Sequence, residues 1–193
     1  MGVIKKTTRK NCTIVIWEIT ETLDDLLQLS HAISTTPLNT EKRKKEWLAS
    51  RLLLNEINPN YSISYNIFGA PELSNGSYIS ISHSKKLVAI IISQQQIGLD
   101  IEKISDKALR ISSKFVSTNS LKGLTAEKAT LIWCCKEAIF KWHQKGGVDF
   151  ITDIKLYPFE SMEKGEIRAI FRDIQLILNY QKINNHYLVY VCK

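Results

Sequence analysis

The chain has 193 residues, of which 44% are hydrophobic and 23% charged, a composition typical of a globular protein with a buried core. No apolar run approaches the roughly 20 residues of a membrane span, and residues 1–11 are not followed by a signal-peptide core and cleavage site. The four cysteines lack CxxC spacing, so we expect a reduced, cytoplasmic protein without zinc. The net charge of +7 favours an anionic partner, although a mildly basic solvated surface explains it equally well.

The first part of the chain predicts a strand, two helices and a further strand. Residues 12–19 are β-branched and apolar, which favours a strand. The leucine spacing of residues 22–33 predicts a short helix, and a longer amphipathic helix is predicted over 40–57. A brief strand is expected over 61–65.

The longer helix carries a basic stripe beside an aromatic residue. Arg43, Trp47 and Arg51 follow one another at intervals of four residues, so they lie on one side of the helix. Such a stripe is typical of a phosphate-binding ridge and also of an ordinary solvated helix face.

The segment from residue 78 to residue 102 predicts a three-stranded antiparallel meander, with strands at 78–84, 87–93 and 97–102. In the last strand, Asp100 and Glu102 share one face, about 7 Å apart along the strand. Two neighbouring carboxylates repel each other unless a cation or a basic partner lies close. The pair therefore indicates either a metal site or a solvated sheet face.

Two residues near this pair add to the argument. Gly98 has no Cβ, so another part of the chain can approach the strand closely at this point. His83 stands at the end of the first strand of the meander, between two serines and just before two lysines. In this setting His83 can donate a hydrogen bond to a phosphate, although a lone histidine at a strand end is usually incidental.

The second part of the chain predicts two helices followed by strands. A short helix is expected over 105–116 and the longest helix of the chain over 126–145. Trp133, Glu137 and Lys141 lie at intervals of four residues, on one side of the longest helix. The Glu–Lys pair could simply stabilise this helix by an ion pair. The strands that follow are predicted over 150–157, 165–172, 174–181 and 187–192.

The order of these elements predicts an α+β fold. Each half of the chain has strands flanking a pair of helices, so we expect two similar α+β lobes in a pseudo-twofold arrangement, each a small antiparallel sheet packed with helices. The N-terminal lobe is predicted to span residues 1–95 and the C-terminal lobe residues 96–193.

Three motifs in this order give the chain a resemblance to a known family. They are the serine–histidine–serine strand 81–84, the Gly-x-Asp-x-Glu strand 98–102, and the Trp-x-x-Lys-Glu-Ala-x-x-Lys stretch 133–141. Together they resemble the 4′-phosphopantetheinyl transferase superfamily, in its two-lobed type associated with surfactin and enterobactin synthetases. The Phe-Gly-x-Pro turn at 68–71 and the arginine-bearing helix segment 47–51 are also similar to that family.

The resemblance implies an Mg²⁺-dependent enzyme. Such enzymes transfer the phosphopantetheine arm of coenzyme A to a serine of an apo acyl or peptidyl carrier protein and release adenosine 3′,5′-bisphosphate. Asp100, Glu102 and Glu137 would bind Mg²⁺, a cation that prefers oxygen ligands. Glu137 would also act as the base, and Lys141 would neutralise the pyrophosphate or the leaving bisphosphate. The residues assigned on this resemblance to coenzyme A are Lys42, Arg43, Arg51, Ser82, His83, Lys136 and Lys141.

Two positions depart from the family pattern, and other functions remain open. Ala70 replaces a frequent lysine in the Phe-Gly-x-Pro turn, and Ser120 replaces a frequent glutamate. A non-catalytic coenzyme A or carrier-protein binding module of the same fold is the main alternative. RNA binding would rest on basic charge alone, so we expect no nucleic-acid partner and no membrane partner. A monomer is expected, and the pathway of the carrier protein stays open.

Overall fold

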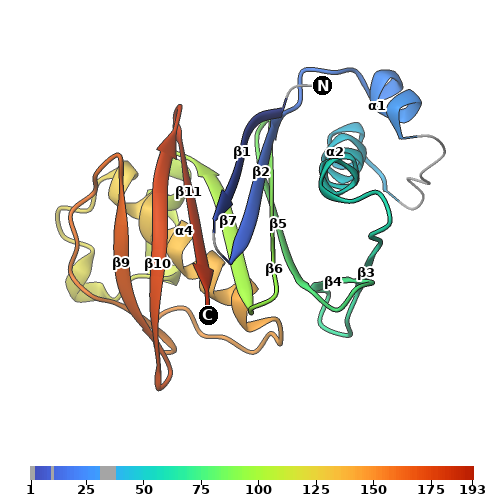
Figure 1. The fold of residues 1–193 in the computed structure, drawn as a ribbon. Helices are drawn as coiled ribbons and strands as arrows, with labels where there is room; N and C mark the ends of the chain where they lie inside the picture. Colours follow the sequence, from blue (N-terminus) through green and yellow to red (C-terminus); the bar gives the residue numbers. More distant parts are fainter. Residues whose placement is uncertain (1–2, 10, 31–37) are drawn as a thin grey trace.

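Two antiparallel sheets, packed face to face and each covered by helices on its outer side, make up the molecule (Figure 1). The structure, a computed structural model, describes residues 3–9, 11–30 and 38–193, apart from the side chains of Val3, Ile4 and Arg9. The layers therefore follow the order helix, sheet, sheet, helix. In the described part of the chain, every helix is too short or too polar to cross a membrane.

The first sheet contains only strands that precede residue 94. In spatial order they are β1 (Val3–Arg9), β2 (Cys12–Glu18), β6 (Leu87–Ser93), β5 (Tyr78–Ser84), β4 (Pro71–Leu73) and β3 (Ile63–Tyr65). The helices α1 (Leu23–Leu29) and α2 (Glu41–Ile57) cover its outer face. Each begins at a threonine, Thr22 or Thr40, whose side chain accepts a hydrogen bond from the first turn.

The second sheet contains only strands that follow residue 96. In spatial order they are β7 (Ile97–Lys103), β11 (His186–Cys192), β10 (Ile174–Ile183), β9 (Lys164–Phe171) and β8 (Ile154–Leu156). The helix α4 (Ala126–His143) packs on its outer face, and α3 (Asp106–Arg110) lies against α4. Short 3₁₀ turns at Ser112–Lys114 and Thr118–Ser120 connect the two helices.

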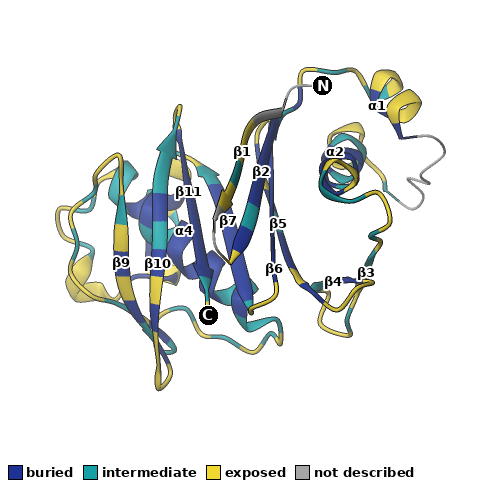
Figure 2. Cartoon of the chain, viewed as in Figure 1, coloured by how far each residue is buried: buried dark blue, intermediate teal, exposed yellow. Residues whose placement is uncertain are grey.

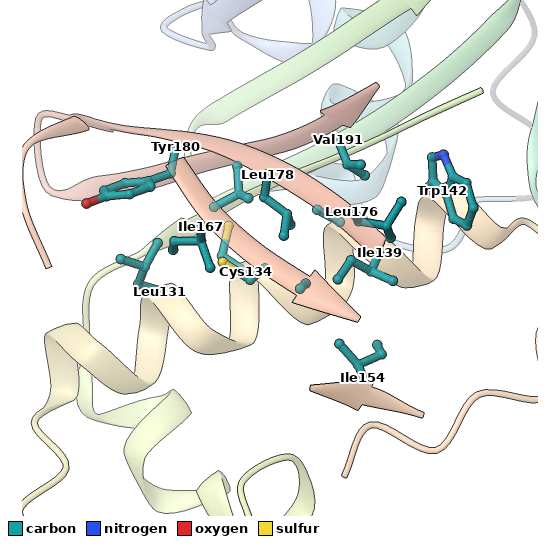
Figure 3. Packing of buried hydrophobic residues seen from close by; sticks show 14 of the residues in the cluster. Leu131, Cys134, Ile139, Trp142, Ile154, Ile167, Leu176, Leu178, Tyr180 and Val191 are labelled. Carbon is teal, nitrogen blue, oxygen red and sulfur yellow. The ribbon is translucent and has the colours of Figure 1, made fainter. Parts of the chain in front are cut away.

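Burial follows these layers, with the darkest strands in Figure 2 lying where the two sheets face each other. Between the sheets, Ile14, Ile91 and Leu99 belong to one apolar cluster. Outside the second sheet, residues of α4 such as Ile139 pack against β10 and β11, for example against Leu178 (Figure 3). The predicted α+β fold with two sheet-and-helix lobes is therefore confirmed.

The predicted meander of residues 78–102 is wrong in its third strand. β5 and β6 pair as predicted, but β7 leaves the first sheet and pairs along its whole length with β11, from Ile97 opposite Cys192 to Lys103 opposite His186. Pairing with the distant C-terminal strand leaves one face of β7 for the apolar cluster between the sheets and the other for α4. Local sequence cannot reveal such a long-range partner.

Other differences concern element ends. β1 and β4 were not predicted, and the strand predicted over 150–157 forms only its last part, β8. The helix predicted over 22–33 ends at Leu29, with its last three positions outside the described residues. The division of the strands near residue 95 agrees with the expected lobes, while the domain boundary itself stays a prediction.

Candidate active site

A close approach of α4 to β7 creates the site, and Gly98 permits that approach. A Cβ atom built on Gly98 would lie 2.0 Å from the carbonyl oxygen of Ala138 and 2.4 Å from the backbone nitrogen of Trp142. Every other residue would push the helix away. The prediction that Gly98 admits another part of the chain is confirmed.

The helix brings its Trp133–Glu137–Lys141 line over the carboxylates of β7. Lys141 Nζ lies 2.7 Å from Asp100 Oδ1, and Trp133 Nε1 donates a 3.3 Å hydrogen bond to Glu102 Oε1. Residues predicted from separate motifs therefore meet at one place.

Hydroxyl groups from β5 complete the contacts of both carboxylates. Ser82 Oγ donates to Asp100 Oδ1 at 2.6 Å, and Ser84 Oγ donates to Glu102 Oε2 at 3.2 Å. The second oxygen of Asp100, Oδ2, is buried and has no hydrogen-bond partner among the described residues. A buried carboxylate oxygen without a partner is costly unless a ligand satisfies it.

The three predicted metal ligands influence one another electrostatically. Burial, and then the charge of Asp100, raise the pKa of Glu137 to about 7, against the opposing effect of Lys141. The same two causes, burial first and then Asp100, raise the pKa of Glu102. A cation placed among these carboxylates would relieve their repulsion.

This set of donors fits Mg²⁺. As their side chains stand, the described residues form no group of three His, Cys, Asp or Glu that could hold a metal ion. Three carboxylates are nevertheless the oxygen donors that Mg²⁺ accepts alongside substrate phosphate and water. The unpartnered Asp100 Oδ2 is the observation of this structure that favours a cation here.

A cavity of about 470 Å³ lies beside the carboxylates, walled by α2, β5, the β3–β4 turn and the end of α4. Four of the side chains that line it can carry positive charge: Arg43, Arg51, His83 and Lys141. Glu46 is the one carboxylate among the described residues that line it. Lys141 belongs both to the cavity and to the Asp100 contact, so it links the basic cavity to the acidic cluster.

Neighbouring side chains hold two of these residues in place. The guanidinium of Arg51 lies 4.0 Å from the centre of the Trp47 ring and donates a 2.8 Å hydrogen bond to the hydroxyl of Tyr65. His83 Nδ1 lies 3.3 Å from Glu46 Oε1. Burial lowers the pKa of His83 despite the opposing charge of Glu46.

The structure places three of the predicted coenzyme A residues elsewhere. Lys136 is only 6% exposed, does not line the cavity, and donates to the carbonyl of Ile154 at 2.7 Å and to that of Phe150. Burial lowers the pKa of this lysine to about 8. Lys42 lies in a separate groove, 3.5 Å from Glu46, and Ser82 is buried against Asp100.

Two contributors escaped the sequence analysis. Glu46 lies on α2, the helix that carries the basic stripe, and its side chain is buried. An acidic residue on the buried side of that helix is the sequence feature that could have pointed to it. Asn66 organises the β3–β4 turn by accepting hydrogen bonds from the N–H groups of Phe68 and Ala70, and it donates to the carbonyl of Gln144 at 3.4 Å. The turn therefore closes one end of the cavity against α4.

Comparisons with known proteins identify the family of the chain. Residues 96–192, half of the chain, match the family model described as the 4′-phosphopantetheinyl transferase superfamily. The 4′-phosphopantetheinyl transferase gsp of Aneurinibacillus migulanus is 30% identical over 111 residues, which cover 52% of this chain and 47% of that relative. The matched region thus spans about half the length of this curated relative. The chain belongs to the 4′-phosphopantetheinyl transferase superfamily.

Proposed function

We propose that this protein transfers the 4′-phosphopantetheine moiety of coenzyme A to a serine hydroxyl of an apo acyl or peptidyl carrier protein in an Mg²⁺-dependent reaction. One observation carries the proposal: Lys141 joins a carboxylate cluster with an unpartnered buried oxygen to a cavity lined by cationic side chains. Phosphoryl transfer requires that combination, because charge on the pyrophosphate must be neutralised while a hydroxyl approaches it.

The cavity supplies the binding of coenzyme A. Arg43, Arg51 and His83 would contact its phosphates, and the stacking of Arg51 on Trp47 fixes one of these cations before the substrate arrives. The net charge of +7 would also speed the encounter with coenzyme A and with acidic carrier proteins.

Asp100, Glu102 and Glu137 would hold the metal ion. When bound, Mg²⁺ supplies a Lewis acid and a template for in-line displacement at the pyrophosphate.

Protein side chains would manage the proton and the leaving group. The serine oxygen of the carrier forms a bond to phosphorus, and the bond from that phosphorus to the oxygen of adenosine 3′,5′-bisphosphate breaks. Glu137, directly or through a water, takes the proton of the serine hydroxyl. Lys141 neutralises the charge that develops on the departing bisphosphate.

A second candidate is a non-catalytic module that binds coenzyme A or carrier proteins. It is supported by the basic cavity alone, because binding of coenzyme A there would not require a metal ion. The two candidates predict the same binding and differ in turnover.

Mass spectrometry of intact carrier proteins tests the proposal. A panel of apo acyl and peptidyl carriers is incubated with the protein, coenzyme A and Mg²⁺, with the Asp100→Ala variant as control. We expect at least one carrier to gain the phosphopantetheine mass with the wild-type protein and none with the variant. If coenzyme A binds but no carrier gains the phosphopantetheine mass, the result would favour the non-catalytic module.

A further inference from the structure

Three serines at alternate positions of β5 face the outer edge of β7. Each hydroxyl accepts a hydrogen bond from a backbone N–H of β7: Leu99 N to Ser80 (2.9 Å), Ile101 N to Ser82 (3.2 Å) and Lys103 N to Ser84 (2.9 Å). We call these three residues the serine ladder. It joins the two sheets by side chains, across a boundary where no strand pairing is found in the described part of the chain.

The ladder satisfies an edge that would otherwise be costly to bury. β7 is an outer strand of the second sheet and pairs with β11 on one side. The N–H groups of Leu99, Ile101 and Lys103 point to the other side, toward β5. Buried N–H groups without acceptors are strongly disfavoured, so the serine hydroxyls replace the missing neighbouring strand.

Two rungs of the ladder have a further contact that the third lacks. Since the hydroxyls of Ser82 and Ser84 accept from the backbone, their own protons are available to the carboxylates of Asp100 (2.6 Å) and Glu102 (3.2 Å). The hydroxyl of Ser80 instead donates a hydrogen bond to the carbonyl of Leu99, at 3.5 Å. The backbone contacts are therefore common to all three serines, and the carboxylate contacts are not.

We propose that Ser82 and Ser84 are positioning residues that orient the carboxylates of Asp100 and Glu102 for the cation. The hydroxyl of Ser82 fixes one oxygen of Asp100, which leaves the unpartnered Oδ2 for a ligand. Because the serines belong to the first sheet and the carboxylates to the second, this part of the orientation of Asp100 and Glu102 requires the two lobes to be docked. This inference rests on the proposed function and deepens its account of the site.

The ladder provides its own matched control. Ser82→Ala and Ser80→Ala each remove one hydroxyl that accepts a backbone N–H, but only Ser82→Ala removes a carboxylate contact. The probe is Mn²⁺, titrated into protein saturated with coenzyme A and followed by the electron paramagnetic resonance signal of free Mn²⁺. We expect Ser82→Ala to weaken Mn²⁺ binding about 10- to 100-fold, as for other residues that support metal ligands.

Ser80→Ala should change the Mn²⁺ affinity by no more than about twofold, far below that range. Hydrogen exchange verifies that each variant has lost its intended rung, because the amide of Leu99 should lose protection in Ser80→Ala and that of Ile101 in Ser82→Ala. If Ser82→Ala does not fold, Ser84→Ala takes its place, with weakening expected in the same range, because Trp133 also holds Glu102 just as Lys141 also holds Asp100.

The outcomes separate the two proposals. Equal weakening in both variants, or none in either, overturns the positioning role while leaving the proposed function in place. Failure of the wild-type protein to bind Mn²⁺ in the presence of coenzyme A overturns the proposed function and this inference with it.

Discussion

The two sides of α4 use the same residue type for different purposes. On the side that faces β7, Lys141 pairs with the carboxylate of Asp100 and lines the basic cavity. On the side that faces residues 150–154, Lys136 donates to the carbonyls of Phe150 and Ile154. Both lysines belong to one sequence motif, yet only Lys141 lines the basic cavity, where a ligand can reach it.

The cavities on the two sides of α4 repeat this difference. The cavity beside β5 has a volume of about 470 Å³ and the one beside β8 about 490 Å³, so size does not distinguish them. The second is lined mainly by apolar side chains, and two of its three lysines, Lys128 and Lys136, are engaged by backbone carbonyls. The charge of the third, Lys155, is offset by that of Glu160 in the same lining. Available positive charge, rather than volume, marks the cavity that suits an anionic substrate.

The largest expected effect concerns the side that faces β7. Glu137→Gln removes both a metal ligand and the proposed base, so kcat for transfer should fall about 10³-fold. Circular dichroism should match the wild-type protein, because the substitution preserves the size of the side chain. A kcat within tenfold of the wild-type value would contradict the role of Glu137.

A smaller loss is expected for the cation on the same side. Lys141→Met should lower kcat about 10²-fold, because the charge that develops on the leaving bisphosphate is no longer neutralised. The Lys141→Arg variant should recover part of the loss in kcat, since it restores the charge with a different geometry. The assay is the initial rate of carrier modification at saturating coenzyme A, and equal rates for the wild-type protein and Lys141→Met would exclude this role.

On the opposite side of α4, a substitution of Lys136 should lower the stability of the protein and leave its catalysis largely unchanged. Lys136→Met leaves two buried carbonyls without their donor, so the free energy of unfolding should fall by about 2–3 kcal/mol. Urea denaturation measures the loss, and the affinity of the folded variant for coenzyme A should stay within about threefold, less than the tenfold that 1.4 kcal/mol represents. A large loss of affinity with unchanged stability would return Lys136 to the binding site predicted from the sequence.

The pH dependence of the free energy of unfolding is a second test of the structural role of Lys136. Burial lowers the pKa of Lys136 to about 8 from 10.5, so between these values the unfolded chain holds a proton that the folded chain has released. The contribution of Lys136 to the free energy of unfolding should therefore rise with pH across this window, by about 1 kcal/mol after allowance for solvent screening. The difference between wild-type and Lys136→Met unfolding at pH 8 and pH 10 isolates this contribution, and a difference that falls with pH would contradict it.

Local patterns predicted most of the fold but not its long-range pairing. The caps and periodicity of α2 and α4 and the alternation of β5 lie within single segments, and these elements occur where predicted. The transfer of β7 to the second sheet depends on β11, some 90 residues away in the chain, so the segment itself carries no sign of it. β1, which contains two lysines and an arginine, lacks the apolar alternation that marks a strand.

The candidate site was predictable in part for the same reason. The faces of Asp100 and Glu102 follow from strand alternation, and the line through Glu137 and Lys141 follows from helix periodicity. Nothing in the spacing separates Lys136 from Lys141 in function, because their difference arises from what packs on each side of the helix. The predicted meander would also have placed Ser82 near Asp100, and the structure brings them together by the packing of β5 against β7 in place of strand pairing.

The most direct test of a cation site between β7 and α4 is the anomalous scattering of Mn²⁺ in crystals of the protein grown with coenzyme A. We expect one peak within ligand distance of Asp100, Glu102 and Glu137, in contact with the pyrophosphate of a coenzyme A molecule whose phosphates reach Arg43, Arg51 or His83. Coenzyme A bound in the cavity with Mn²⁺ absent from these carboxylates, or bound elsewhere on the protein, would contradict the account.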